Sequence, residues 1–225
     1  MTYLICLFLS LTFLLPTSAQ SPVPIEKEPR HRLQFSNQLV RVFNVLIPAG
    51  DTSLFHIHVN DGLSVRLGDA RIRDEALGGT SEDIAVKRGA VSFGYRTSPL
   101  THRVSSIGST HFRNIFVEIL PSTRKPPGVP PQALVAGQTL VLENERVRIS
   151  RLVLAPGQSI EMHTHALQGL GVAVSEGRIV IEVPGEKLRT VKFKPGDSQW
   201  YEGGTKHSLK NVGSAPFEAV EIELK

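Results

Sequence analysis

Cysteine is almost absent from the 225-residue sequence, in which the only one is Cys6. This residue lies inside an apolar stretch, residues 4–15, and small residues follow the stretch up to Ala19. This pattern is typical of a secretory signal peptide, so we expect residues 1–19 to be one, with cleavage after Ala19. The mature chain would then contain no thiol and no disulfide bond, which suits a secreted or periplasmic protein.

The same apolar stretch is too short to cross a bilayer, which takes about 20 apolar residues. We therefore expect no membrane span after signal cleavage. No Lys or Arg precedes the stretch, although a signal peptide normally begins with positive charge. A retained N-terminal anchor is the alternative interpretation.

Clusters of one charge are also lacking. The chain has 25 Lys and Arg residues against 21 Asp and Glu, a formal net charge of +4, and they are scattered along the sequence. The densest basic group is Arg30-His31-Arg32. A protein that follows a phosphate backbone needs a basic stripe, so we expect no nucleic-acid partner. The charge indicates only a mild attraction for anions.

Long segments with helical periodicity are absent as well. Apolar residues alternate over short runs instead, as at Ile179, Ile181 and Val183, and turn residues separate these runs. The composition, with 40% hydrophobic and 20% charged residues, 19 Gly and 15 Pro, is that of a globular protein with many tight turns. Half-buried strands produce such alternation, so the sequence predicts an all-β fold.

The sequence contains an internal duplication with an offset of about 105 to 107 positions. The matching segments are 37–50 with 144–157, 56–65 with 163–172, and 101–120 with 206–225. A repeat of this size indicates two domains, and the Pro-rich stretch between the copies is typical of an extended linker. We therefore expect a signal peptide (1–19), an N-terminal segment (20–36), domain 1 (37–120), a linker (121–136) and domain 2 (137–225).

Six of the eight histidines fall at equivalent places in the two copies: His56, His58 and His102, and His163, His165 and His207. Residues two apart on a strand face the same side, so each His-x-His pair points two imidazoles one way. A third histidine from a later strand would complete a set able to hold a divalent transition metal such as Fe, Mn, Ni or Zn. Histidines that are only hydrogen-bonded within the core are the alternative. His31 and His111 lie outside these sets.

The residues around these histidines resemble the cupin superfamily. Its first motif is matched by Gly157, His163, His165 and Gly177, and its second by Gly196, Gly204, His207 and Asn211. The first copy keeps Gly50, His56, His58 and His102, with Ser106 in place of the Asn. The resemblance covers residues 37–225 and implies two tandem cupin jelly-roll (double-stranded β-helix) barrels, a bicupin. The metal-binding Glu of the first motif falls at Leu63 and Leu170, which leaves three-histidine sets.

Three neutral imidazoles leave a divalent ion with its full charge, so we expect a small anionic oxygen chelator as ligand. Some non-haem iron dioxygenases that resemble cupins use three histidines, which makes a metal-dependent dioxygenase the leading enzymatic hypothesis. A non-catalytic small-ligand-binding protein and a metal-free structural cupin are the alternatives, because this fold hosts many functions. A homodimer is a further expectation.

Four other residues of the second copy are candidates for the site. Glu161 lies two residues before His163, and on a regular strand it would share that face and could act as a catalytic base. The alternative is a strand that starts later and leaves Glu161 solvated. Gln168, Ser198 and Trp200 are candidate ligand-pocket residues, Gln168 as a weak oxygen ligand and the other two on one strand face. Turn positions or core packing are the alternatives for these three.

Overall fold

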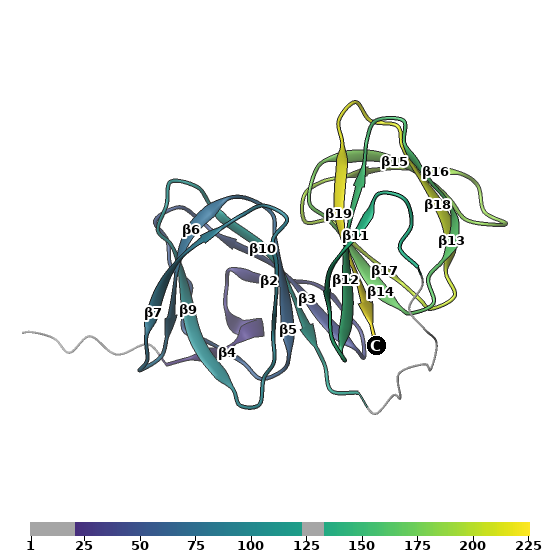
Figure 1. Cartoon of the computed structure of the whole chain (residues 1–225). Coiled ribbons are helices and arrows are strands. Elements are labelled where there is room, and N and C mark those ends of the chain that lie inside the picture. The colour runs from purple at the N-terminus through teal and green to yellow at the C-terminus, as the bar shows by residue number, and fades with distance from the viewer. Residues whose placement is uncertain (1–20, 123–132) are drawn as a thin grey trace, which may run out of the picture.

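Figure 1 shows a computed structural model of the chain, which describes residues 21–122 and 133–225. The described residues form two β-barrels that lie side by side (Figure 1). The expected signal peptide, residues 1–19, lies outside the described residues, and so does most of the Pro-rich linker. Within the described ranges, no helix has the length and hydropathy that a bilayer span requires.

The first barrel consists of two five-stranded sheets, with the orders β1-β4-β9-β6-β7 and β2-β3-β10-β5-β8. Its elements are β1 (Val23–Pro24), η1 (Ile25–Lys27), β2 (His31–Ser36), β3 (Val40–Ile47), β4 (His56–His58), β5 (Gly62–Arg66), β6 (Ala70–Ala76), β7 (Ser81–Val86), β8 (Val91–Gly94), β9 (Leu100–Ser106) and β10 (Phe112–Ile119). Because β1 and β2 join these sheets, most of the segment 20–36 is part of the first barrel and does not merely precede it.

The second barrel repeats this arrangement with the sheet orders β11-β12-β19-β14-β17 and β13-β18-β15-β16. Its elements are β11 (Gln138–Glu143), β12 (Val147–Leu154), β13 (Ser159–Thr164), β14 (Gly169–Ala173), β15 (Gly177–Glu182), β16 (Arg189–Phe193), β17 (Ser198–Tyr201), β18 (Lys206–Asn211) and β19 (Phe217–Leu224). The prediction of two tandem all-β barrels is therefore confirmed.

The central strands of both barrels are buried on two faces. In β10, Phe112 packs inside the first barrel, whereas Ile115 and Val117 belong to an apolar cluster that both barrels share. Val220 and Ile222 of β19 are in the same shared cluster. The sheets that contain β10 and β19 thus pack face to face, which explains why these strands are buried along almost their whole length.

Candidate metal centres

Strands β4 and β9 bring the three histidines of the first barrel together. His56 and His58 lie two residues apart on β4, and His102 of β9 pairs directly with His56. One ring nitrogen from each of the three lies within 4.8 Å of the other two. The first predicted set therefore converges on one point.

The second set converges in the same way. His163 of β13 pairs with His207 of β18, and His165 directly follows β13. The Nε2 atom of His207 lies 3.2 Å from His163 Nε2 and 3.0 Å from His165 Nε2. Three nitrogens this close together, each from a separate imidazole, form the kind of donor set that a transition metal prefers.

The motif glycines serve the turns that precede the histidine strands. Gly50 and Gly157 have φ values of +78° and +79°, a backbone region that residues with a Cβ rarely adopt. Each turn sets the start of the segment that carries the His-x-His pair. Local backbone geometry therefore explains why glycine stands at positions 50 and 157.

Hydrogen bonds fix which ring nitrogen faces each centre. His56 Nδ1 donates to the carbonyl oxygen of Leu54 at 2.9 Å, and His163 Nδ1 donates to the carbonyl oxygen of Glu161 at 3.0 Å. An imidazole that carries its proton on Nδ1 keeps the lone pair on Nε2, which is the form that ligates a metal. The two barrels thus share one device for orienting the first histidine.

In the first barrel, a carboxylate orients a second ligand. His102 Nδ1 lies 2.7 Å from Asp74 Oδ1. The Nε2 atoms of His56 and His102 are buried and have no hydrogen-bond partner among the described residues. A buried nitrogen without a partner is costly, and a bound cation would satisfy both atoms. These side chains therefore fit a metal ion.

Four of the six histidines stay neutral well below neutral pH. Burial, reinforced by the neighbouring imidazoles, lowers the pKa of His56 to about 3 and that of His165 to about 3. Burial and the nearby His163 lower the pKa of His207 to about 4, and burial also lowers the pKa of His58. At neutral pH these rings are unprotonated, so their lone pairs are available.

The structure corrects the expected position of the motif glutamate. Leu63 and Leu170 belong to the cluster between the barrels, so they face away from the histidines. The inward positions are Gly62 and Gly169, one residue earlier. A Cβ there would collide with the ring of Phe116 in the first barrel and with the ring of Tyr201 in the second. The space for a carboxylate is therefore filled by an aromatic side chain in both barrels.

A cavity of about 250 Å³ adjoins the first trio. Arg66 of β5 lines it, donates to Ser92 Oγ at 3.4 Å and lies 5.3 Å above the ring of Phe112. Burial lowers the pKa of Arg66 to about 10, so it is still a cation at neutral pH. Among the described residues, no carboxylate forms an ion pair with it within 4.0 Å. The first cavity thus contains a cation that no carboxylate contacts directly, with Asp74 of the same lining as the charge that acts on it.

The cavity beside the second trio, about 160 Å³, is more apolar, and it contains a carboxyl group that the sequence analysis missed. Glu221 of β19 lines it together with Tyr201. Burial, with a smaller contribution from the charge of Glu223, raises the pKa of Glu221 to about 7, although a hydrogen bond from Gln138 opposes the shift. The Tyr201 hydroxyl is buried without a hydrogen-bond partner among the described residues. The sequence signal that could have identified Glu221 is the pair of glutamates at positions 221 and 223, which alternate with apolar residues at the end of β19.

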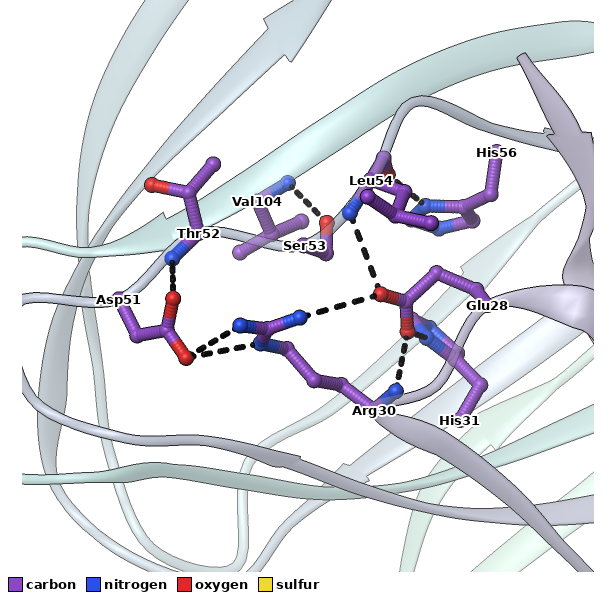
Figure 2. Close-up of polar contacts among 9 residues, drawn as sticks. All are labelled: Glu28, Arg30, His31, Asp51, Thr52, Ser53, Leu54, His56 and Val104. Carbon is purple, nitrogen blue, oxygen red and sulfur yellow. Dashed lines mark hydrogen bonds and ion pairs between the residues drawn. The ribbon is translucent and has the colours of Figure 1, made fainter. Parts of the chain in front are cut away.

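Figure 2 shows a second group that the sequence analysis missed, the buried pair Glu28 and His31. Glu28 accepts hydrogen bonds from His31 Nδ1 at 2.6 Å, from the Arg30 amide at 2.7 Å and from the Leu54 amide at 3.1 Å. Burial alone would raise the pKa of Glu28, but these hydrogen bonds hold it below its usual value. The Leu54 carbonyl in turn accepts from His56, so the segment upstream of residue 37 supports the first trio.

Glu161 does not share the inward face of His163. β13 starts at Ser159, but a register shift between Ile160 and His163 interrupts its alternation and leaves Glu161 exposed. Its side chain is therefore badly placed for the catalytic role that a regular strand would give it. Its contribution is the backbone carbonyl that orients His163.

The three candidate pocket residues lie mostly outside the second cavity. Gln168 lines an open cleft between the barrels, and Ser198 is absent from the lining of the second cavity. Trp200 borders that cavity, but its ring stacks on Phe35 of the first barrel at 5.9 Å between centroids. The residue of β17 that packs against a metal-site histidine is Tyr201, with its ring 4.1 Å from that of His165.

Comparisons with known proteins agree with this architecture. Residues 150–223 match the family described as Cupin domain. A cupin domain from Bordetella pertussis Tohama I is 30% identical over 39% of this chain and 91% of that one, with a TM-score of 0.37. The chain belongs to the cupin superfamily, and with its two barrels it is a two-domain cupin. No curated protein matches it.

Two solved structures are similar over most of the chain. AerE from Microcystis aeruginosa has a TM-score of 0.63 at 12% identity, covering 91% of this chain and 98% of its own. Oxalate decarboxylase from Bacillus subtilis, described with Mn(II) centres, has a TM-score of 0.55 at 14% identity, covering 82% of this chain and 68% of its own. Identities this low show a common fold alone.

Proposed function

We propose that this protein is a metal-binding bicupin whose first barrel binds a small carboxylate that chelates the metal. The observation that carries the proposal is Arg66, which lines the same cavity as the first histidine trio. A divalent ion held by three neutral imidazoles keeps its full positive charge and supplies Lewis-acid chemistry to oxygen ligands. Arg66 adds a second cation with two parallel donors, which is suited to a carboxylate.

The second barrel lacks this arrangement. In the first barrel, Arg66 pairs with Asn114 of β10. The equivalent pair in the second barrel is Ala173 with Ala219 of β19. A methyl group thus replaces the guanidinium at this position. The arginine that does line the second cavity, Arg189, is exposed and lies 3.9 Å from Glu186. The nearby Glu221 would repel an anion. We therefore propose carboxylate binding for the first barrel only.

Titration calorimetry of the Mn(II)-loaded protein tests this proposal. We expect oxalate and glycolate to bind, whereas glucose, a neutral compound rich in oxygen, does not. Arg66→Ala should lower the affinity for both carboxylates by about tenfold or more, the usual effect of losing a charge-assisted hydrogen bond. The matched control is Arg71→Ala, which removes an exposed arginine of the same barrel. Glucose binding without carboxylate binding would refute the proposal.

The proposal also includes the identity of the metal and the type of reaction. The donor set suits Fe, Mn, Ni or Zn, and the Mn(II) centres of the oxalate decarboxylase make manganese a sensible first metal. Dioxygenase activity is tested by oxygen uptake of the Fe(II)-loaded protein with carboxylates and diketones. Binding without oxygen uptake would exclude dioxygenase activity toward these compounds and favour a non-oxygenase role such as ligand binding. Secretion or export to a periplasm is part of the same proposal and is tested by fractionating cells that express the full chain.

A further inference from the structure

A row of four neighbouring side chains crosses the first barrel on the sheet that carries Arg66. His31 of β2 pairs with Val45 of β3, Val45 pairs with Asn114 of β10, and Asn114 pairs with Arg66 of β5. All four residues line the cavity beside the first trio. Paired positions on adjacent strands face the same side of a sheet, so one ligand in the cavity meets these groups together. We call His31, Asn114 and Arg66 the polar row.

The second barrel has an almost apolar counterpart. There Gln138 pairs with Leu152, Leu152 with Ala219, and Ala219 with Ala173. Methyl groups thus stand where the first barrel has an amide and a guanidinium. The second barrel has the same strand pairing without the polar row, so the fold does not require these groups.

Asn114 presents an acceptor that has no donor. Its Nδ2 atom donates to Ser64 Oγ at 3.1 Å, which turns Oδ1 the other way. This oxygen is buried and has no hydrogen-bond partner among the described residues. A buried acceptor without a donor is unfavourable, and a ligand with an O–H group would satisfy it.

His31 is the member of the polar row that lies next to the trio. Its Nδ1 atom lies 2.6 Å from the buried carboxylate of Glu28 (Figure 2). The ring centroid lies 4.4 Å from that of His56 and 6.4 Å from that of His58. Glu28 therefore holds the His31 ring at the edge of the trio.

We propose that the polar row selects a hydroxycarboxylate, such as a 2-hydroxy acid, over a fully ionised dicarboxylate. Arg66 pairs with the carboxylate, and Asn114 Oδ1 accepts a hydrogen bond from the hydroxyl group. Oxalate is fully ionised at neutral pH and has no proton to donate, so it gains nothing from this acceptor. The inference rests on the proposed carboxylate site and names the chemical class of its ligand.

Calorimetry with glycolate and oxalate as paired probes tests the inference on the Mn(II)-loaded protein. Asn114→Ala introduces the residue found at the equivalent place in the second barrel, and we expect glycolate affinity to fall about fivefold to tenfold. Oxalate affinity should change by less than about twofold, because no hydrogen bond to oxalate is lost. Asn44→Ala, on the outer face of β3, is the matched control.

The outcomes separate the two proposals. If Asn114→Ala weakens both probes equally, or neither, the hydroxyl-selecting role is wrong and the carboxylate site stands. If the unmodified protein binds neither probe, the carboxylate site is wrong and the inference is wrong with it. Metal content is measured in every sample, and loss of Mn(II) from the variants would show a structural role and overturn the inference.

Discussion

Replacing Asp74 by Asn tests whether the first trio is built for a metal. The Asp74 carboxylate lies 2.7 Å from His102 Nδ1, and its side chain is 38% exposed. Asn can still accept this hydrogen bond but loses the charge that makes the imidazole a stronger ligand. Loss of such a partner usually costs about 10–100-fold in metal affinity, and partial exposure places the expected loss near tenfold, or about 1.4 kcal/mol.

The second barrel supplies an internal reference for this experiment. In the first barrel, Asp74 pairs with Val104 of β9. The equivalent pair in the second barrel is Ile181 with Leu209 of β18, so an uncharged side chain stands in place of Asp74. Asp74→Asn should therefore weaken only the first site. The assay is competition for Zn(II) against a chromophoric chelator in a His207→Ala background, where only the first trio is intact.

The matched control for Asp74 lies on the same hairpin. Asp83→Asn removes a carboxylate that forms an exposed ion pair with Arg73, away from the histidines. We expect this variant to bind Zn(II) as tightly as its parent. Equal affinities of the Asp74 and Asp83 variants would refute the argument that Asp74 tunes a metal ligand.

Two further predictions concern the folded protein without metal. Because the folded-state pKa values of His56, His165 and His207 lie at about 3 to 4, below the ordinary 6.5, the unfolded chain binds protons first as pH falls. Urea unfolding should show full stability above about pH 6.5 and a progressive loss toward about pH 3, and a stability that does not change over this range would contradict the assignment. Gly169→Ala should cost about 1–3 kcal/mol, because its Cβ would collide with a tyrosine ring and a backbone carbonyl, whereas Gly171→Ala meets open space. Equal melting temperatures of the two glycine variants would contradict this prediction, because they would show that the barrel accommodates a Cβ at residue 169 without cost.

The histidine sets could be predicted from sequence for two physical reasons. Side chains two apart on a strand share a face, so His56 with His58, and His163 with His165, were expected to point together. The duplication then identified the third member of each set. Neither argument needs the long-range geometry, which is why this part of the site agrees with the structure.

Other parts depended on single-residue register, which sequence does not determine. The motif spacing allowed the glutamate position to fall at either of two neighbours, and a shift of one residue turns Gly169 inward and Leu170 outward. A register shift in β13 has the same effect on Glu161, because it breaks the alternation without a Gly or Pro to mark it. The sequence also did not show which face of β17 turns inward, and Trp200 lies on the outward face, where it pairs with Leu170.

The Glu28–His31 pair could not be found from the duplication, because its segment lies upstream of the aligned copies. Only the pairing of β2 with β3 shows that His31 faces the cavity. Arg66 was missed for a related reason, since its equivalent is Ala173 and a comparison of the copies gives it no special weight. The groups that distinguish the barrels are thus the ones that the repeat conceals.

Metal analysis of the untagged protein, with the stoichiometry per chain, is the most direct test of the central claim that two histidine trios each hold one ion. We predict two equivalents of a divalent transition metal after loading and removal of excess, and one equivalent for His207→Ala, which disrupts only the second trio. A protein that retains no metal under these conditions, or a variant that retains as much as its parent, would contradict the account.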